Sequence, residues 1–245
     1  MKIQRFITRP DLNISVVIPA LNERAALPDV VERVRRCLPS AEVVVADGGS
    51  GDGMREWVLG RPDLRLVDAE RGRGPQMNAG ARSAGGEVLL FLHADCLLPD
   101  GAEEAIRAAL ADPAAVGGAF CIRFAADCPA SLHRLAGLIN LRSRLASEAT
   151  GDQAVFVRRA VFEAVQGFPD WPLFEDFALV SRVKRQGRFR ILPAAVTISP
   201  RRWLTHGVWR TSLLMCLLYL GYRLGVAPTT LKRWFADVRP PPVPP

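Results

Sequence analysis

Acidic side chains follow three apolar runs in the first half of the chain. Glu23, Asp47 and Asp95 each come after a short run typical of a buried parallel strand, and for Asp95 that run is VLLFL at residues 88–92. The carboxyl ends of parallel strands meet at one edge of a sheet, where open α/β folds bind their ligands, so we expect these carboxylates to converge. Carboxylates bind divalent cations, and the cluster could therefore hold a metal ion together with a nucleotide.

Two arginines lie in a glycine-containing loop that we place at the same edge. Arg71 and Arg73 alternate with Gly72 and Gly74 before a predicted helix. Acidic groups do not bind phosphate without a metal, whereas guanidinium groups pair directly with phosphate oxygens. The loop could therefore contact a diphosphate, although isolated arginines in a loop are more often solvated charges.

Candidates for the substrate side lie later in the chain. Asp152 and Gln153 could hydrogen-bond a sugar or an acceptor, or could equally be turn residues. His206 could complete the metal site or be an exposed loop histidine. The pair Glu175 and Asp176 opens a predicted helix.

The elements that must position these residues alternate between strand and helix. Apolar runs predict strands at 14–18, 43–46, 64–67 and 88–92, and helical patterns begin at Leu27 and cover 54–59, 75–83 and 102–110. This alternation predicts an α/β fold with a mostly parallel central sheet flanked by helices. In the less regular second half we expect strands at 116–124, 154–157, 189–192 and 195–198, and helices at 131–146 and from 174–176 to about 186.

Composition limits the class of protein and its partners. The 245 residues are 49% hydrophobic and 23% charged, which is ordinary for a globular chain with one sizeable core. A net charge of +7 favours an anionic partner, either nucleic acid, a phosphorylated small molecule or a membrane surface. The five cysteines form no CxxC pairs, and the first 13 residues lack the apolar core of a secretory signal. We therefore expect a cytoplasmic location.

The C-terminal part contains an uncharged, leucine-rich stretch at residues 211–222. As a helix it is shorter than the ~20 apolar residues needed to cross a bilayer. Flanking aromatic and basic residues, among them Trp209 and Arg223, suit a helix that lies in a membrane interface. Docking on the core or on another subunit is an equal alternative. Residues 240–245 form a proline-rich tail.

Six motifs in a fixed order carry a family resemblance. They are SVVIPALNE at 15–23, VVADGGSGD at 44–52, QMNAG at 76–80, HAD at 93–95, ED at 175–176 and RRW at 201–203. Together they resemble family 2 glycosyltransferases of the GT-A fold, over roughly residues 14–203. Within that family the chain is similar to short bacterial members that share the RGR…QMNAGA and FLHAD stretches.

The resemblance implies a role for each matching residue. Glu23 and Asp47 would contact the nucleobase and ribose of a nucleotide-diphosphate sugar, and Asp95 would bind Mn or Mg as the last residue of a degenerate DXD motif whose first position is His93. Asp176 would be the general base of an inverting transfer. Substrate or acceptor contacts would come from Glu175, Arg202 and Trp203.

The resemblance implies a sugar-nucleotide donor, which we expect to be a UDP-sugar, and nucleic acid is not expected. The apolar, aromatic and basic C-terminal stretch indicates that the acceptor could be lipid-linked at the inner face of the cell membrane. We divide the chain into a catalytic domain (1–205), an apolar and basic helical extension (206–239) and the tail (240–245).

Three other classes of protein compete with this interpretation. A sugar-nucleotide nucleotidyltransferase should carry a glycine- and arginine-rich loop after the first strand, where this chain has PALNE at residues 19–23. A non-catalytic sugar-nucleotide-binding or membrane scaffold protein would not need to retain both Asp95 and Asp176. A dinucleotide-dependent oxidoreductase is disfavoured because no GxGxxG spacing occurs at a strand-helix junction.

Overall fold

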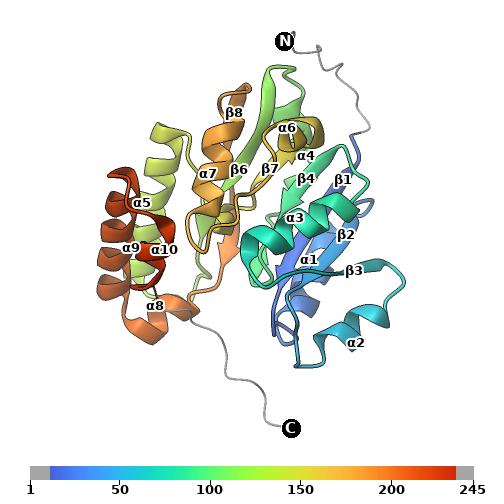
Figure 1. Ribbon diagram of the computed structural model, residues 1–245, viewed down its shortest axis with the longest axis horizontal. Coiled ribbons are helices and arrows are strands. Elements are labelled where there is room, and N and C mark those ends of the chain that lie inside the picture. Colours follow the sequence, from blue (N-terminus) through green and yellow to red (C-terminus); the bar gives the residue numbers. More distant parts are fainter. Residues whose placement is uncertain (1–11, 236–245) are drawn as a thin grey trace.

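A computed structural model describes residues 12–235, which build one eight-stranded sheet with helices on both faces (Figure 1). The spatial order of the strands is β3-β2-β1-β4-β7-β6-β8-β5. The strands are β1 (Ile14–Ala20), β2 (Glu42–Asp47), β3 (Leu64–Asp68), β4 (Val88–Phe91), β5 (Cys96–Leu97), β6 (Ala115–Arg123), β7 (Phe156–Arg158) and β8 (Arg188–Ile198). The predicted tail and the first 11 residues lie outside this range.

Helices alternate with these strands as the sequence pattern predicts in the first half. They are α1 (Leu27–Cys37), α2 (Met54–Leu59), α3 (Arg73–Ser83), α4 (Ala102–Leu110), α5 (Ala130–Ala146), the single 3-10 turn η1 (Gly151–Gln153), α6 (Arg159–Ala164), α7 (Glu175–Val183), α8 (Arg201–His206), α9 (Val208–Arg223) and α10 (Pro228–Lys232). The short helices α6 and α8 were not expected from the sequence.

The parallel part of the sheet is the half that carries the first acidic motifs. β1 pairs in parallel with β2 and β4, and β2 pairs in parallel with β3. Every residue of β1 is buried, as in a strand covered on both faces. Helix α3 approaches this strand so closely that a Cβ on Gly80 would lie 2.4 Å from the Val17 side chain. Glycine is therefore required there.

The second half of the sheet departs from the simple alternation. β7 lies antiparallel between β4 and β6, whereas β8 runs parallel to β6. The two strands expected at 189–192 and 195–198 are one strand, because an irregularity between Phe120 and Cys121 shifts the register of β6 against β8 without ending the pairing. The predicted α/β class with a mostly parallel sheet is confirmed.

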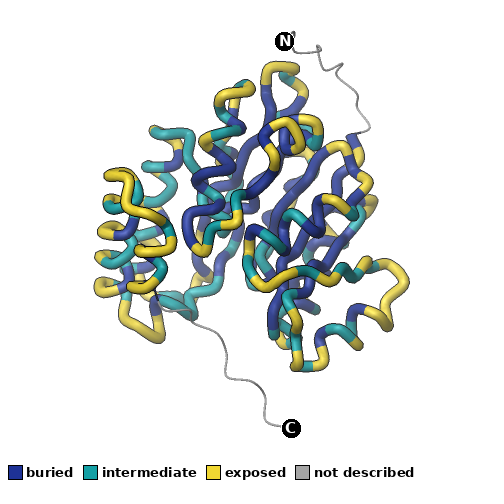
Figure 2. The backbone as a smooth tube through the Cα atoms, viewed as in Figure 1, coloured by how far each residue is buried: buried dark blue, intermediate teal, exposed yellow. Residues whose placement is uncertain are grey.

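Apolar side chains fill both faces of the sheet. Val16 and Ile18 belong to the cluster on one face and Val17 to the cluster on the other, as the alternation of side chains along a strand requires. The backbone tube is buried through the centre of the sheet and exposed along its outer helices (Figure 2). A firm core thus supports the carboxyl ends of the strands.

Helices α5, α9 and α10 lie side by side at one end of the molecule (Figure 1). The predicted helix at 211–222 is confirmed as the larger part of α9. A separate apolar cluster joins α9 and α10 to the segment that opens α7; its buried members are Leu173, Phe174, Phe177, Leu218, Leu231 and Phe235. None of the helices in residues 12–235 is long and apolar enough to cross a membrane. The division at residue 205 stays a prediction, since it falls within α8.

Candidate active site

A cavity of about 500 Å³ opens at the carboxyl ends of β1 and β4. Most of the residues proposed from the sequence lie in its wall: Glu23, Arg71, Arg73, His93, Asp95, Asp152, Glu175, Asp176, Arg202 and Trp203. Further wall residues come from α5, α9 and the segment before α7, and many of these are apolar. The cavity thus has a charged part at the sheet edge and an apolar part between helices.

Arg201 connects two acidic residues of the charged part. Its Nη2 lies 3.4 Å from an oxygen of Glu23 and 3.7 Å from an oxygen of Asp95. Burial raises the pKa of Glu23; Arg201 opposes this rise, and the charge of Asp95 adds to it. The convergence of Glu23 and Asp95 expected from their strand-end positions is therefore observed, with an arginine between them.

Three potential metal ligands gather next to this group. One ligand atom each from His93, Asp95 and Cys96 lies within 4.8 Å of the others. His93 Nδ1 is 2.9 Å from a carboxylate oxygen of Asp152, which fixes the imidazole ring. Although burial opposes ionisation of Asp152, its hydrogen bond with His93 and the charges of His93 and Arg73 lower its pKa to about 2.

The donor set suits a divalent cation only in part. The His93 nitrogen and the Asp95 carboxylate are ligands that Mn²⁺ accepts. The Asp95 side chain is 31% exposed and therefore open to a cation. The Cys96 thiol is buried, and burial together with the nearby Asp95 raises its pKa well above 9.0. Thiolates favour softer ions. His93 and Asp95 therefore fit the cation better than Cys96 does.

A second acidic pair lies at the start of α7. Asp176 accepts hydrogen bonds from the Gly151 N–H at 2.6 Å and from the Phe177 N–H at 2.7 Å. Burial raises the pKa of Asp176. The neighbouring Glu175 is buried, and burial together with the charge of Asp176 raises its pKa to about 7. Such a pair can hold and exchange a proton near neutral pH.

Arg71, in the loop before α3, and Arg73, the first residue of α3, line this acidic cavity. Within residues 12–235, Arg71 and Arg73 make no side-chain hydrogen bond or ion pair, and both side chains are exposed. Although desolvation opposes its charge, Glu175 and Asp152 raise the pKa of Arg73. The Arg73 guanidinium is therefore held in its charged form, and both side chains are available to an anionic ligand.

Two motif residues at the beginning of α8 shape the cavity wall. Trp203 is buried and packs edge-on against Phe124, with ring centroids 5.2 Å apart. The Arg202 guanidinium carbon lies 4.2 Å from the ring centroid of Phe235. Both residues line the cavity, and the contacts that the structure shows for them are with the aromatic rings of Phe124 and Phe235.

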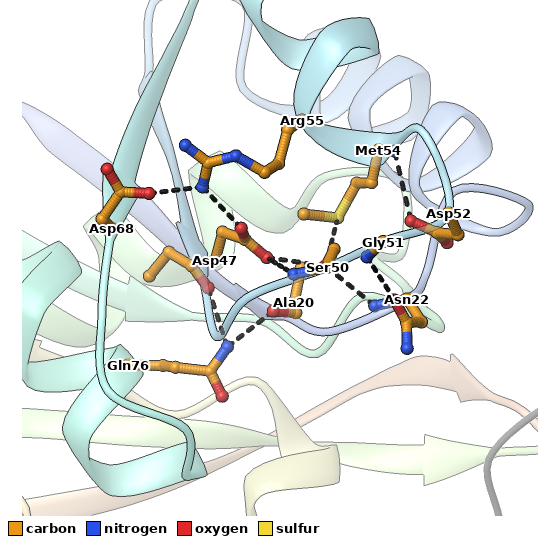
Figure 3. Close-up of polar contacts among 11 residues, drawn as sticks. Ala20, Asn22, Asp47, Ser50, Gly51, Asp52, Met54, Arg55, Asp68 and Gln76 are labelled. Carbon is orange, nitrogen blue, oxygen red and sulfur yellow. Dashed lines mark hydrogen bonds and ion pairs between the residues drawn. The ribbon is translucent and has the colours of Figure 1, made fainter. Parts of the chain in front are cut away.

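The structure does not bring Asp47 to the cavity (Figure 3). Its side chain is fully buried and accepts hydrogen bonds from the Ser50 N–H at 2.9 Å, the Ser50 hydroxyl at 2.6 Å and Arg55 at 2.7 Å. Burial opposes ionisation, but these hydrogen bonds dominate and lower the pKa of Asp47. In this geometry Asp47 holds the glycine-rich turn, and a nucleotide contact would require Ser50 or Arg55 to release it.

Gln153 and His206 also lie away from the cavity. Gln153 is fully buried: its amide donates to the Phe120 carbonyl at 2.8 Å and accepts from the Thr150 N–H at 3.0 Å. The expectation of a substrate contact is therefore corrected to a role in fixing η1. His206 is exposed at the end of α8, and the metal-ligand group does not include it. Its predicted place in a metal site is not supported.

Sequence reasoning missed several residues that shape the cavity. Arg201 was part of the RRW motif but had no role assigned to it, and Cys96 directly follows Asp95. Gln76 donates to the Ala20 and Ala46 carbonyls at 2.6 and 2.9 Å, so it ties α3 to the ends of β1 and β2 (Figure 3). Arg142, on α5, had no sequence signal at all.

A match to a known family covers the first part of this fold and site, up to β7. Residues 15–158 match Glycosyl transferase family 2, which is more than half of the 245-residue chain. The chain therefore belongs to this family, as the motifs predict.

Curated relatives match shorter stretches. The chain is 35% identical over 94 residues to succinoglycan biosynthesis protein ExoA of Rhizobium meliloti (strain 1021), covering 35% of this chain and 28% of that protein. It is 38% identical over 63 residues to polyprenol monophosphomannose synthase of Mycolicibacterium smegmatis, covering 26% of this chain and 23% of that protein. The matched stretches thus span about a quarter of these relatives.

Solved structures share the fold over a larger part of the chain. The mannosyltransferase PcManGT from Pyrobaculum calidifontis, in complex with GDP-Man and Mn²⁺, has a TM-score of 0.64 at 22% identity and covers 92% of this chain and 68% of its own. Glucosyl-3-phosphoglycerate synthase from Mycobacterium tuberculosis has a TM-score of 0.61 at 17% identity. The match covers 89% of this chain and 81% of that protein's chain. The likeness confirms the GT-A fold.

Proposed function

We propose that this chain is an inverting glycosyltransferase that moves a sugar from a nucleotide-diphosphate sugar to an acceptor hydroxyl. The observation that carries the proposal is the content of one cavity: two unpaired arginines, a histidine-carboxylate group suited to a cation, and the acidic pair Glu175 and Asp176. Binding a diphosphate and accepting a proton are the two tasks that glycosyl transfer requires.

The charged part of the cavity would bind the donor. Arg71 and Arg73 would pair with diphosphate oxygens and stabilise the negative charge that grows on the leaving group. When bound, a divalent cation held by Asp95 and His93 would neutralise part of that charge. Glu23 would contact the nucleoside, since it lies at the end of β1 beside Asp95.

Asp176 would act as the general base. Inversion requires a base on the face of the sugar opposite the leaving diphosphate, where it takes the proton of the acceptor hydroxyl. The Gly151 and Phe177 N–H groups orient the carboxylate, and burial raises its pKa, which strengthens it as a base. Glu175 would support this role through the shared proton of the pair.

A UDP-sugar is the donor that we propose, with Mn²⁺ or Mg²⁺ as the cation. Structures of similar fold were solved with UDP, with UDP-GlcNAc and with GDP-Man and Mn²⁺. The nucleotidyltransferase and the scaffold protein remain alternatives that one experiment separates. Only a glycosyltransferase should release the sugar from a UDP-sugar to water or to an acceptor.

The test compares sugar transfer or UDP-sugar hydrolysis with and without Mn²⁺ in the wild type and in Asp176→Asn. The variant should bind UDP normally but turn over roughly a hundredfold more slowly, as expected for loss of a general base. Asp170→Asn, at an exposed position outside the cavity, is the matched control. Wild-type protein that neither binds UDP nor consumes any UDP-sugar would overturn the function, and unchanged turnover in Asp176→Asn would remove Asp176 from its role.

The acceptor would be reached at a membrane surface. Helices α5 and α9 expose large apolar side chains, including Leu145 and Trp209 at 79% each, with arginines such as Arg144 and Arg210 close to them in the sequence. Apolar burial together with attraction to anionic lipids is the binding mode of interfacial helices. We therefore place the enzyme at the inner face of the cell membrane, with a lipid-linked acceptor.

A further inference from the structure

Arg142 of α5 presents an unsatisfied cation in the cavity wall. Its Nε and Nη2 atoms are buried and have no hydrogen-bond partner in the part of the chain that the structure describes. Buried guanidinium donors are normally hydrogen-bonded, because the desolvation of a charged group must be compensated. The proposed donor site does not use this residue.

Among residues 12–235, the neighbours of Arg142 are aromatic rings rather than hydrogen-bond acceptors. Its guanidinium carbon lies 5.3 Å from the ring centroid of Phe177 and 5.5 Å from that of Tyr219, so two aromatic rings hold it in place. Glu148 accepts hydrogen bonds from Tyr219 at 2.7 Å and from Arg223 at 2.8 Å. No carboxylate in the described part of the chain lies within ion-pair distance of Arg142.

The same wall carries further unsatisfied donors beside apolar surface. The hydroxyl oxygens of Thr211 and Ser212, at the start of α9, are also buried without a hydrogen-bond partner, and Ser212 lines the cavity. The part of the wall that α5 and α9 form includes the apolar residues Leu135, Ile139 and Met215. This wall combines a fixed cation with apolar side chains, which is the chemistry that an amphiphilic anion needs.

We propose that Arg142 binds the phosphate group of the acceptor, with the remainder of the acceptor along Leu135, Ile139 and Met215. The subsite lies beside the acidic pair, because Phe177 directly follows Asp176. It is distinct from the Arg71 and Arg73 loop, which would take the diphosphate of the donor. This inference rests on the proposed function, since it assigns the acceptor side of the same cavity.

The experiment measures binding of two phosphate monoesters by calorimetry. Decyl phosphate represents a lipid-linked phosphate and glycerol 3-phosphate a soluble one, and both are titrated with UDP and Mn²⁺ at saturation so that the donor site is filled. Arg142→Gln should weaken binding about tenfold or more, as expected for loss of a charge-assisted hydrogen bond. Arg142→Lys keeps the charge, so its affinity for the phosphate monoesters should lie between those of the wild type and Arg142→Gln. Arg134→Gln, exposed on the same helix and outside the cavity, should bind like the wild type.

The outcomes distinguish a lipid-linked from a soluble phosphate. They also distinguish failure of the Arg142 subsite from failure of the proposed donor site. Loss of decyl phosphate binding alone in Arg142→Gln supports a lipid-linked acceptor, and loss of glycerol 3-phosphate binding supports a soluble one. If neither ligand binds the wild type, or if Arg142→Gln binds both as tightly as the wild type, the subsite does not exist. UDP binding by the wild type is measured separately, and the phosphate titrations are repeated without UDP, so failure of the donor site is recognised independently.

Discussion

The Asp95 side chain makes polar contacts with Arg201 and with the Cys96 thiol and contributes little to the apolar core. Its carboxylate is partly exposed and lies 3.7 Å from Arg201, so a substitution leaves the core intact. Asp95→Ala should therefore fold normally but lose metal-dependent binding of UDP. Asp100→Ala, at an exposed strand-helix junction where the side chain pairs with Arg33, serves as the control. Titration of UDP with and without Mn²⁺ measures the effect, and wild-type metal dependence in the variant would contradict the assignment.

Glu175 makes the stability of the protein depend on pH. Its pKa rises from the ordinary value of 4.5 to about 7, so the folded state keeps a proton that the unfolded chain releases. The free energy of unfolding should therefore fall as the pH rises from about 4.5 through 7. Glu175→Gln should flatten this part of the pH profile, measured as Tm at several pH values, whereas exposed Glu70→Gln should keep it. A profile that is equally steep in Glu175→Gln would show that another group is responsible.

Where a strand end fixes the backbone, sequence position predicted which side chains reach the cavity. Asp95, Glu23 and His93 reach the cavity because β1 and β4 end at the same edge of the sheet. Asp47 does not reach the cavity, because its carboxylate already accepts hydrogen bonds from Ser50 and Arg55. A motif does not report which hydrogen bonds a carboxylate already makes. Contacts between residues far apart in the sequence, such as those of Arg142 with the rings of Phe177 and Tyr219, have no local signature.

At the scale of elements, the turn η1 positions His93 through Gly151. A Cβ on Gly151 would lie 2.5 Å from His93 Nε2, so Gly151→Ala should displace the imidazole and break its contact with Asp152. We expect about tenfold weaker Mn²⁺-dependent UDP binding, since ligand orientation is lost. Gly137→Ala has open space around it on α5 and should be neutral or slightly stabilising. Equal Mn²⁺ dependence in both variants would contradict the role of η1.

The elements themselves followed from periodicity in the first half and less completely in the second. Helix α4 begins and ends where the helical pattern predicts, at Ala102 and Leu110. In the second half, β8 continues through Pro193, and α6 is only six residues long. Short helices and irregular strands depend on tertiary contacts more than on local pattern, which explains these differences.

At the scale of the whole molecule, the helical end carries more exposed apolar surface than the core fold requires. The large exposed apolar residues of α5 and α9 are Leu138, Leu141, Leu145, Trp209, Leu213, Leu217 and Leu220. Figure 2 shows this end mostly as exposed and intermediate, whereas the sheet beside it is largely buried. The inner side of α9 is covered by the cluster around Phe177 and Leu218. The helix therefore docks on the protein with one side and leaves the other free.

This free side should bind anionic liposomes in a co-sedimentation assay. Each leucine that enters the membrane contributes about 1.5–3 kcal/mol, so Leu213→Glu with Leu217→Glu should weaken binding by roughly a hundredfold or more. Leu59→Glu, 70% exposed on α2 away from this end, should bind like the wild type. High salt should weaken wild-type binding partly, because it screens only the attraction between arginines and lipids. If wild-type protein stays in the supernatant at low salt, light scattering should then show that the leucines are buried between two copies of the chain.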